Sequence, residues 1–280
     1  MVDDVIGRDI MSLGIQVLVI GDPAQLPPVK NAGRAGYFMR NRPTALLTEI
    51  QRHGGIILDL AQDVRKNGVE VLTDKRYEAI VHRSLGASMA LGYDQIIVGR
   101  NITRDRKNET IRNLFESEDD AWVAPEERII MLETNYKYNV LNSQQFYVDE
   151  CEPIVHEHQQ VRMRLTCECL PSGASLCPYC GWLSRSEAMV WSDGFTGCKE
   201  AENMDPQPRW RALWATYGYA ITAQGSEWDS VLVVDENHVF RKWSVNWLYT
   251  AITRARKELT IIRTGTGPRR QHAREEERHA

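Results

Sequence analysis

The chain has 280 residues, of which 42% are hydrophobic and 26% charged, a composition typical of a soluble globular protein. At about 150 residues per domain, this length allows one large domain or two modest ones. Its 34 Lys and Arg against 38 Asp and Glu give a net charge of -4, so bulk charge neither favours nor excludes a nucleic-acid partner. No apolar run approaches the roughly 18 residues that span a membrane, and the acidic start MVDDVIGRD is unlike a signal peptide. We therefore expect a cytoplasmic protein that does not contact membranes.

Short aliphatic runs alternate with amphipathic helical patterns along most of the chain. The runs lack polar alternation, which is typical of strands buried on both faces of a parallel sheet. The helical segments carry an apolar stripe, as in GGIILDLAQDVRKNG, where a glycine ends the pattern. This alternation predicts an α/β fold with right-handed crossovers. In chain order we predict a strand over 15–21, a helix over 54–68, a strand over 94–101, a helix over 103–115, strands over 128–132 and 230–236, a helix over 246–258 and a strand over 258–263.

The stretch from 150 to 210 interrupts this alternation, because it is rich in Cys, Pro, Gly and Trp and has few helical periods. We interpret it as a small β-rich insertion within the second α/β unit. Its tryptophans (Trp182, Trp191 and Trp210) are interpreted as core of this insertion, with base-stacking platforms as the alternative. Residues 265–280 mix charges without periodicity and are predicted to form a disordered tail.

The segment VLVIGDPAQLPPV, residues 17–29, joins a predicted buried strand to a proline-rich turn. The turn places Gln25 at the carboxyl edge of the predicted sheet, where open α/β sheets bind their ligands. A neutral amide at this edge can orient a water molecule or a phosphate oxygen without adding charge. The alternative is a loop in which Gln25 is merely solvated.

GDPAQLPPV resembles the third conserved motif of superfamily 1 helicases, specifically their RecD-like and Dda-like branch. Further matches follow in the same order as in that family. They are TEIQRH (48–53), DQIIVGRNITRDRKNETIR (94–112), NYKYNVLNSQQF (135–146), YGYAITAQGSEWDSVLVVDEN (217–237) and WLYTAITRARKELTII (247–262). The resemblance implies RecA-like P-loop NTPase units: the end of a first one over 1–45 and most of a second over 46–149 and 211–264, with the insertion between.

By this resemblance Gln25 senses the γ-phosphate of ATP, while Arg52 and Arg254 contact it and stabilise the charge that hydrolysis develops. Arg254 is expected on the predicted helix beside its apolar stripe, pointing into a cleft. The alternative is that Arg254 and Arg256 are both solvated helix residues.

The resemblance also implies further contacts with nucleotide and DNA. Gln224, Gly225 and Glu227 would lie against the nucleotide, with the carboxylate accepting from the ribose hydroxyls. The residues expected to touch single-stranded DNA are Thr222, Asn101 and Arg104, although Asn101 can equally be a helix cap.

Two departures from the family pattern stand out. No Gly-x4-Gly-Lys-[Ser/Thr] occurs, so the chain has no P-loop lysine for the phosphates, and the Asp-Glu pair that handles Mg²⁺ is absent. We therefore expect the C-terminal part of a helicase, which needs an N-terminal half for ATP and Mg²⁺ and does not hydrolyse ATP alone. Between Ala223 and Gln224 the chain also lacks three residues that family members carry, which puts the role of Thr222 in doubt.

The cysteines are confined to one segment, which favours a local metal site over a disulfide framework. Cys167-x-Cys169 is followed, after seven intervening residues, by Cys177-Pro-Tyr-Cys180-Gly181. A Cys-x-x-Cys-Gly turn lets two sulfurs face one ion, and four thiolates complete a structural zinc site. Reduced structural thiols or a redox pair are the alternatives. Substitute ligands would be His156, His158 and Cys198.

Taken together, the sequence predicts the second half of an ATP-dependent DNA helicase that moves 5′ to 3′ on single-stranded DNA by analogy with the branch. The alternative is a non-enzymatic remnant that binds DNA or protein through a zinc module. A nuclease lacks support, because no compact carboxylate cluster is visible in the sequence.

Overall fold

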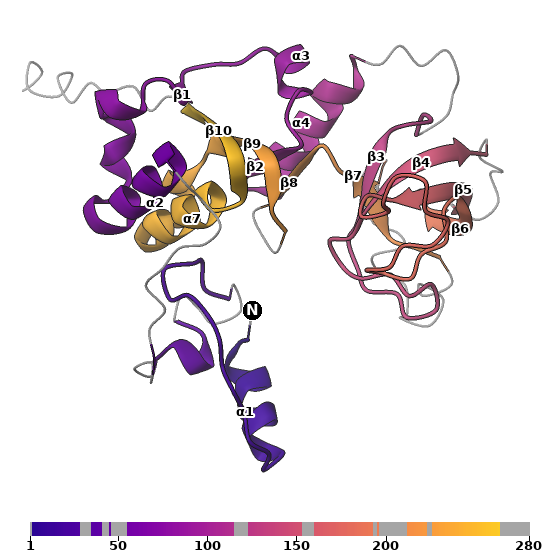
Figure 1. Ribbon diagram of the computed structural model, residues 1–280, viewed down its shortest axis with the longest axis horizontal. Coiled ribbons are helices and arrows are strands. Elements are labelled where there is room, and N and C mark those ends of the chain that lie inside the picture. The colour runs from indigo at the N-terminus through magenta and orange to yellow at the C-terminus, as the bar shows by residue number, and fades with distance from the viewer. Residues whose placement is uncertain are drawn as a thin grey trace, which may run out of the picture. The chain divides into compact units, whose positions relative to one another are not determined.

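The protein is described from a computed structural model, which places residues 2–28, 35–40, 45, 55–114, 123–152, 160–192, 195, 212–222 and 226–263. The chain forms two compact units (Figure 1), one of Met1–Asn101 with Thr222–Ala280 and the other of Ile102–Ile221. The two units divide the chain after residues 101 and 221. The sequence predicted domain boundaries after residues 45, 149 and 210. No helix among the described residues is long and apolar enough to cross a lipid bilayer.

The first unit is built on a five-stranded sheet in the order β1-β10-β9-β2-β8, in which β10 and β2 both run parallel to β9. Val233 of β9 is fully buried and pairs with Ile261 on one side and Ile97 on the other. Coverage of both faces explains the continuous aliphatic runs and confirms the strands predicted over 94–101, 230–236 and 258–263. The strands are β1 (Val81–His82), β2 (Gln95–Val98), β8 (Ala220–Thr222), β9 (Trp228–Asp235) and β10 (Ala255–Arg263).

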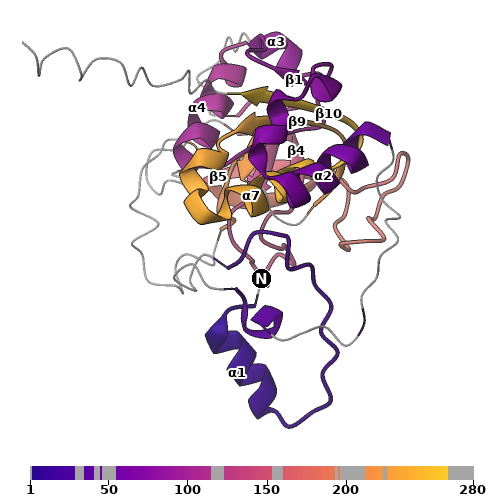
Figure 2. The ribbon, with the colours of Figure 1, turned by 90° about the vertical axis from the view of Figure 1, so that its left-hand side faces the viewer.

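Helices α2 (Gly55–Asn67) and α7 (Ser244–Ile252) pack against each other and against this sheet (Figure 2). The helix predicted over 54–68 is confirmed, and it ends where Gly68 adopts a φ of 84°. The helix predicted over 246–258 is wrong in its last part. Because Ala255 already pairs with Trp228 in the sheet, the helix stops early and Ala255 is buried in a strand instead.

The strand predicted over 15–21 does not form. These residues are irregular, and their apolar side chains are exposed, Leu18 by 85% and Ile20 by 83%. A strand is stabilised by the N–H and C=O groups of a neighbouring strand, and no strand of the described residues pairs with this run. The prediction failed because it relied on composition alone, without a partner strand. We call residues 15–21 the apolar run.

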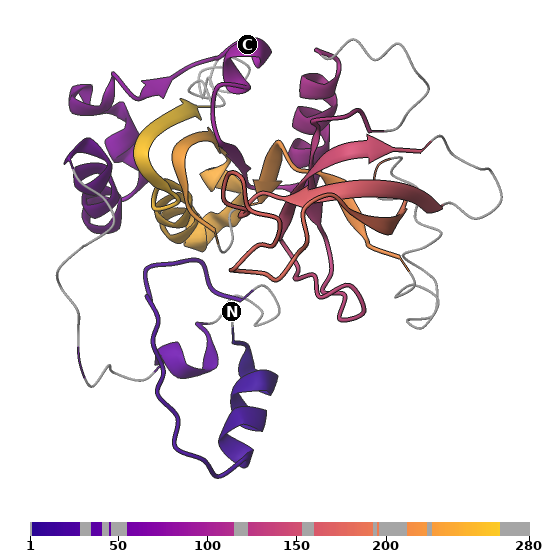
Figure 3. The ribbon, with the colours of Figure 1, turned by 45° about the vertical axis from the view of Figure 1, so that its right-hand side comes forward.

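The second unit is a small antiparallel sheet in the order β6-β5-β4-β3-β7 (Figure 3). The strand predicted over 128–132 is present as β3, but in this antiparallel sheet and not in the parallel one, because the chain turns back over residues 132–144 and pairs it with β4. Leu213 closes the sheet: its N–H donates to Met189 at 2.7 Å and its carbonyl accepts from Trp191 at 2.9 Å. The strands are β3 (Arg128–Met131), β4 (Gln145–Cys151), β5 (Gln160–Cys167), β6 (Ser186–Trp191) and β7 (Ala215–Tyr217).

Helix α4 (Asn101–Arg112) confirms the helix predicted over 103–115. Its Asn108 is 1% exposed and joins the helix to the segment after β7. The side-chain amide of Asn108 donates to the carbonyl of Tyr217 at 2.8 Å and to that of Ala220 at 3.3 Å, and its oxygen accepts from the N–H of Ala220 at 2.7 Å. Two further helices are α1 (Asp4–Ser12) and the single turn α3 (Ala87–Ala90).

Candidate functional site

The proline-rich loop after the apolar run docks onto α7. Asp22 accepts a hydrogen bond from the hydroxyl of Tyr249 at 2.9 Å, and the backbone N–H of Leu26 donates to the hydroxyl of Thr250 at 2.9 Å. The side chain of Asn246 donates to the carbonyls of Ala24 and Gln25, among others, at 3.0 and 3.2 Å. One face of α7 thus holds a loop that is more than two hundred residues away in the sequence.

Within this loop Gln25 keeps an exposed side chain. Its backbone is fixed at both ends, because its N–H donates to the carbonyl of Asp22 at 3.2 Å and its carbonyl accepts from Asn246. The loop therefore presents an amide on a fixed backbone, which is what orienting a phosphate or a water molecule requires.

Arg254 lies in the turn between α7 and β10, not on a helix as predicted, and it is only 6% exposed. Its Nε donates to the carbonyl of Thr250 at 3.0 Å, and one Nη donates to the carbonyl of Ser226 at 3.4 Å. The alternative of two solvated helix arginines does not describe Arg254, which is buried, and Arg256 is exposed but lies on β10 and pairs with Asp229. A buried guanidinium that spans two backbone segments orders both of them.

Thr250 connects these two features. Its hydroxyl accepts a hydrogen bond from the docked loop, and its carbonyl accepts one from Arg254. The structure thus brings the Gln25 loop and Arg254 to a shared residue of α7, although Gln25 itself contacts Asn246 near the start of the helix. Glu227 is half-buried and adjoins Ser226, the other partner of Arg254. Three residues predicted to act with them lie outside the described residues: Arg52, Gln224 and Gly225.

The predicted DNA-contacting residues lie on two different elements. Thr222 is half-buried at the end of β8, and Asn101 is exposed at the first position of α4. The side chain of Arg104 is 18% exposed and pairs with Asp105 at 2.8 Å.

Sequence reasoning missed a buried carboxylate at the carboxyl edge of the parallel sheet. Glu236 follows β9 and its side chain is 2% exposed. It accepts from the backbone N–H groups of Gly99 at 2.8 Å and Arg100 at 3.1 Å, and it pairs with the guanidinium of Arg100 at 2.6 Å. The available signal was the acidic Asp-Glu pair directly after an aliphatic run, which was interpreted only as the end of a strand.

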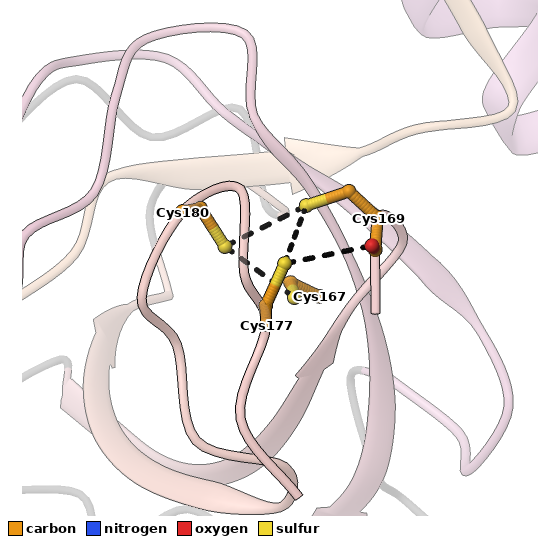
Figure 4. Close-up of side chains that lie close together, drawn as sticks. All are labelled: Cys167, Cys169, Cys177 and Cys180. Atoms are coloured by element: carbon orange, nitrogen blue, oxygen red, sulfur yellow. Dashed lines mark hydrogen bonds between the residues drawn. The ribbon is translucent and has the colours of Figure 1, made fainter. Parts of the chain in front are cut away.

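The four predicted metal ligands converge in the second unit (Figure 4), with their sulfur atoms all within 4.8 Å of one another. The Sγ of Cys169 lies 3.3 Å from that of Cys177 and 3.5 Å from that of Cys180, which in turn lies 3.5 Å from that of Cys167. With Zn–S bonds of about 2.3 Å, sulfurs at the corners of a tetrahedron are about 3.8 Å apart. The cluster can therefore hold a zinc ion after a small expansion.

The backbone of residues 167–183, the cysteine loop, is shaped around this cluster. The N–H of Gly181 donates to the carbonyl of Cys177 at 2.9 Å, and Gly181 has a φ of 71°, a conformation that favours glycine. Trp182, near the end of the loop, donates to the carbonyl of Leu165 at 3.0 Å and packs edge-on against Phe146. Trp182 and Trp191 are buried, which confirms their interpretation as core, while Trp210 lies outside the described residues.

The surroundings of Cys177 favour its thiolate form. Burial raises the pKa of Cys177, but the backbone N–H groups of Cys180 and Tyr179, with other hydrogen bonds, outweigh burial and lower it to about 6. Burial and hydrogen bonds within the cluster raise the pKa of Cys169 to about 12, and they raise that of Cys167 further. Since a thiolate is the form that binds a metal, Cys177 offers the first ligand at neutral pH.

The remaining cysteine-segment residues do not add to this cluster. Cys151 is a free thiol in β4, and burial is the main cause that raises its pKa to about 11. The substitute ligands considered from the sequence lie outside the described residues; they are His156, His158 and Cys198. No disulfide forms among the described cysteines.

One family of known proteins matches part of the chain. Residues 217–262 match the family described as UvrD-like helicase C-terminal domain, a stretch that contains β9, α7 and Arg254. No curated protein matches the sequence.

A solved structure of a Pif1 helicase resembles this fold over most of the chain. The Candida albicans protein aligns with a TM-score of 0.54 over 88% of this chain at 12% identity. Two others have lower scores: a Bacteroides protein in complex with ADP-AlF3 and single-stranded DNA (0.44, 14% identity, 77% of this chain), and one from a study of unwinding at forked DNA by two coordinating Pif1 helicases (0.46, 14%, 78%). This chain spans 64% of the Candida chain and 50% and 49% of the other two. The TM-score of 0.54 shows that this chain shares the fold of the Candida helicase.

Proposed function

We propose that this chain supplies the second motor domain of an ATP-dependent DNA helicase of the RecD-like and Dda-like branch, moving 5′ to 3′ on single-stranded DNA. The observation that carries the proposal is the meeting of two distant segments on α7. The Gln25 loop binds one side of Thr250 and Arg254 binds the other, and both segments resemble helicase motifs expected to face the nucleotide. The family match over 217–262 supports the same assignment.

In this proposal the terminal phosphate of ATP competes for Arg254. The guanidinium holds the carbonyls of Thr250 and Ser226, and a phosphate is a stronger, charge-assisted partner than a neutral carbonyl. Release of Ser226 would then move the loop that follows β8 whenever nucleotide binds. Gln25 orients the γ-phosphate. Arg52 is the second positively charged side chain, after Arg254, that contacts this phosphate. The nucleotide is held further by Gln224, Gly225 and Glu227.

The DNA side of the proposal uses Thr222, Asn101 and Arg104. Thr222 immediately precedes the loop that Arg254 controls, so nucleotide binding can alter its grip on a phosphate. Positively charged side chains that contact phosphates contribute binding that weakens with salt. Arg104 is expected to contribute in this way.

Zinc has a structural role in this proposal. Cys167, Cys169, Cys177 and Cys180 would bind it with four thiolates, which leaves no open position for catalysis. Binding would tie the end of β5 to the cysteine loop, since Cys167 is the last residue of that strand.

The first test is a paired assay of the purified chain. We expect binding of labelled oligo-dT by fluorescence anisotropy, and no ATP hydrolysis with or without DNA, because ATP and Mg²⁺ would need the P-loop and Asp-Glu pair of an N-terminal helicase half. Hydrolysis by the chain alone contradicts the incomplete-motor proposal. DNA binding without any response to nucleotide, when such a half is supplied in trans, favours the non-enzymatic remnant.

The second test compares two arginines two residues apart. In an assembly with an N-terminal half that restores hydrolysis, Arg254→Ala is expected to lower the rate by about a thousandfold or more, as for other arginines that contact the transferred phosphoryl group. Arg256→Ala, which removes an exposed ion pair with Asp229, is the matched control and should change the rate less than about twofold. Equal effects of the two variants would remove Arg254 from the nucleotide site.

A further inference from the structure

Two tyrosines of the second unit are almost completely exposed. Tyr136 is 90% exposed and Tyr179 is 80% exposed, whereas the tryptophans of the same unit are buried or half-buried where the structure describes them. Burial of an aromatic ring is strongly favourable, so two exposed rings in one small unit call for an explanation. Neither ring has a role in the core or in the metal cluster.

A hydrogen bond joins the two segments that carry these rings. Tyr179 is at the tip of the cysteine loop, and Tyr136 is in the turn over residues 135–140, which we call the tyrosine turn. The side chain of Asn139 donates to the carbonyl of Cys180 at 3.2 Å, which joins the two segments directly. The N–H of Asn139 also approaches the carbonyl of Tyr136 at 3.4 Å. The two tyrosines therefore flank a single contact point.

Both segments are held rigidly before any ligand arrives. Asn135 is 5% exposed; its oxygen accepts from the N–H of Lys137 at 3.1 Å, and its amide donates to the carbonyl of Ala212 at 3.1 Å. The cysteine loop is closed by the bridge between Leu176 and Leu183 and by the cluster of sulfurs. Rigid aromatic side chains lose little entropy when they bind, which suits them for contacts that hold a flexible partner.

We propose that Tyr136 and Tyr179 form a stacking platform for the bases of single-stranded DNA. The proposal rests on the proposed function for its ligand, and it adds a binding surface that the helicase motifs do not include. Every base has an aromatic face, so exposed rings on a rigid frame bind single strands with little sequence preference. Lys137 and Arg185, both exposed, supply positive charge for the phosphates, and Arg185 approaches Asp149 only at 3.8 Å.

A surface that stacks on bases differs from a site that contacts phosphates in how its binding depends on salt. Four thiolates around one zinc ion carry a net charge of -2, so the tip of the cysteine loop gains no attraction for DNA from its metal. The rings must supply the affinity there. Loss of a ring should therefore weaken binding without changing its dependence on salt, since salt dependence reports the phosphate contacts.

The experiment measures binding of the full chain, loaded with zinc, to fluorescein-labelled oligo-dT and to an abasic oligonucleotide of the same length. We expect Tyr136→Ala and Tyr179→Ala each to weaken oligo-dT binding by about 5- to 100-fold. Binding to the abasic strand and the salt slope should be unchanged. Tyr136→Phe and Tyr179→Phe keep the ring and should restore binding to within about twofold of the unmodified chain.

Leu141→Ala and Leu183→Ala are the matched controls, because these side chains are 60% and 58% exposed, directly after the tyrosine turn and at the end of the cysteine loop, but have no aromatic face. If the leucine variants lose as much affinity for oligo-dT as the tyrosine variants, the contribution does not depend on an aromatic ring and the platform is refuted. If the chain binds oligo-dT and the tyrosine variants bind equally well, the platform is refuted and the proposed function stands. If the unmodified chain binds no single-stranded DNA, both fail. Zinc content and circular dichroism, measured on every variant, establish that the variants are folded.

Discussion

Asn108 of α4 offers the sharpest test of the packing in the second unit. Asn108→Ala removes three hydrogen bonds in a site that is 1% exposed, and it leaves the N–H of Ala220 and the carbonyl of Tyr217 without these partners. A buried polar group that loses its partner costs about 1–3 kcal/mol. Alanine favours a helix over asparagine by about 0.6 kcal/mol, which offsets part of this loss. We expect a decrease of about 2–4 kcal/mol in the free energy of unfolding.

The measurement is urea unfolding followed by tryptophan fluorescence, with the midpoint and slope compared between variants. Asn113→Ala is the matched control, because Asn113 is exposed just after the same helix and its backbone bond to Glu109 survives the substitution. It should change stability by less than about 0.5 kcal/mol. Asn108→Asp keeps the acceptor for Ala220 but loses both donors, so it should destabilise at least as much as Asn108→Ala. A stability of Asn108→Ala within about 0.5 kcal/mol of the unmodified chain would refute this account.

Three further predictions concern the metal cluster, a buried ion pair and the docked loop. Metal analysis should find one zinc ion per chain, and Cys177→Ser should lose it together with cooperative unfolding of the second unit. Glu127→Gln should lower the free energy of unfolding by about 2–4 kcal/mol, because Glu127 is 1% exposed and pairs with Arg112 at 2.9 Å; an unchanged urea midpoint would contradict this. Burial, with the charge and hydrogen bond of Asp22, raises the pKa of Tyr249 to about 12. Since the pKa of an unfolded tyrosine is about 10, this contribution to stability is complete below pH 10 and is lost between pH 10 and 12. Tyr249→Phe should therefore show a smaller fall in urea midpoint over that range.

Much of the fold could be predicted from local pattern. The aliphatic runs that became β2, β9 and β10 pair with one another in a single sheet. The strands predicted from their composition are therefore present. The run over 128–132 has the same composition, yet the chain turns back after it and pairs it with β4 in an antiparallel sheet. The apolar run over 15–21 had the pattern of a buried strand, but no strand among the described residues pairs with it. Pairing partners are a property of the whole chain, which a local pattern does not contain.

The cysteine cluster could be predicted because its ligands are close in sequence and their spacing fixes their geometry. Arg254 was identified by motif, but its burial and its two carbonyl partners depend on where α7 ends. Glu236 and Asn108 were missed for a related reason. Each is a single polar residue whose importance comes from backbone groups brought to it by the fold, Gly99 for one and Ala220 for the other.

The apolar run has a practical consequence for handling the purified protein. Four consecutive aliphatic residues, Val17–Ile20, carry no charge and leave unpaired backbone groups available. Such a segment is a ready template for intermolecular β-pairing. Precipitation of the isolated chain should therefore accelerate steeply with concentration, and a lysine in place of Leu18 should slow it without altering the folded units.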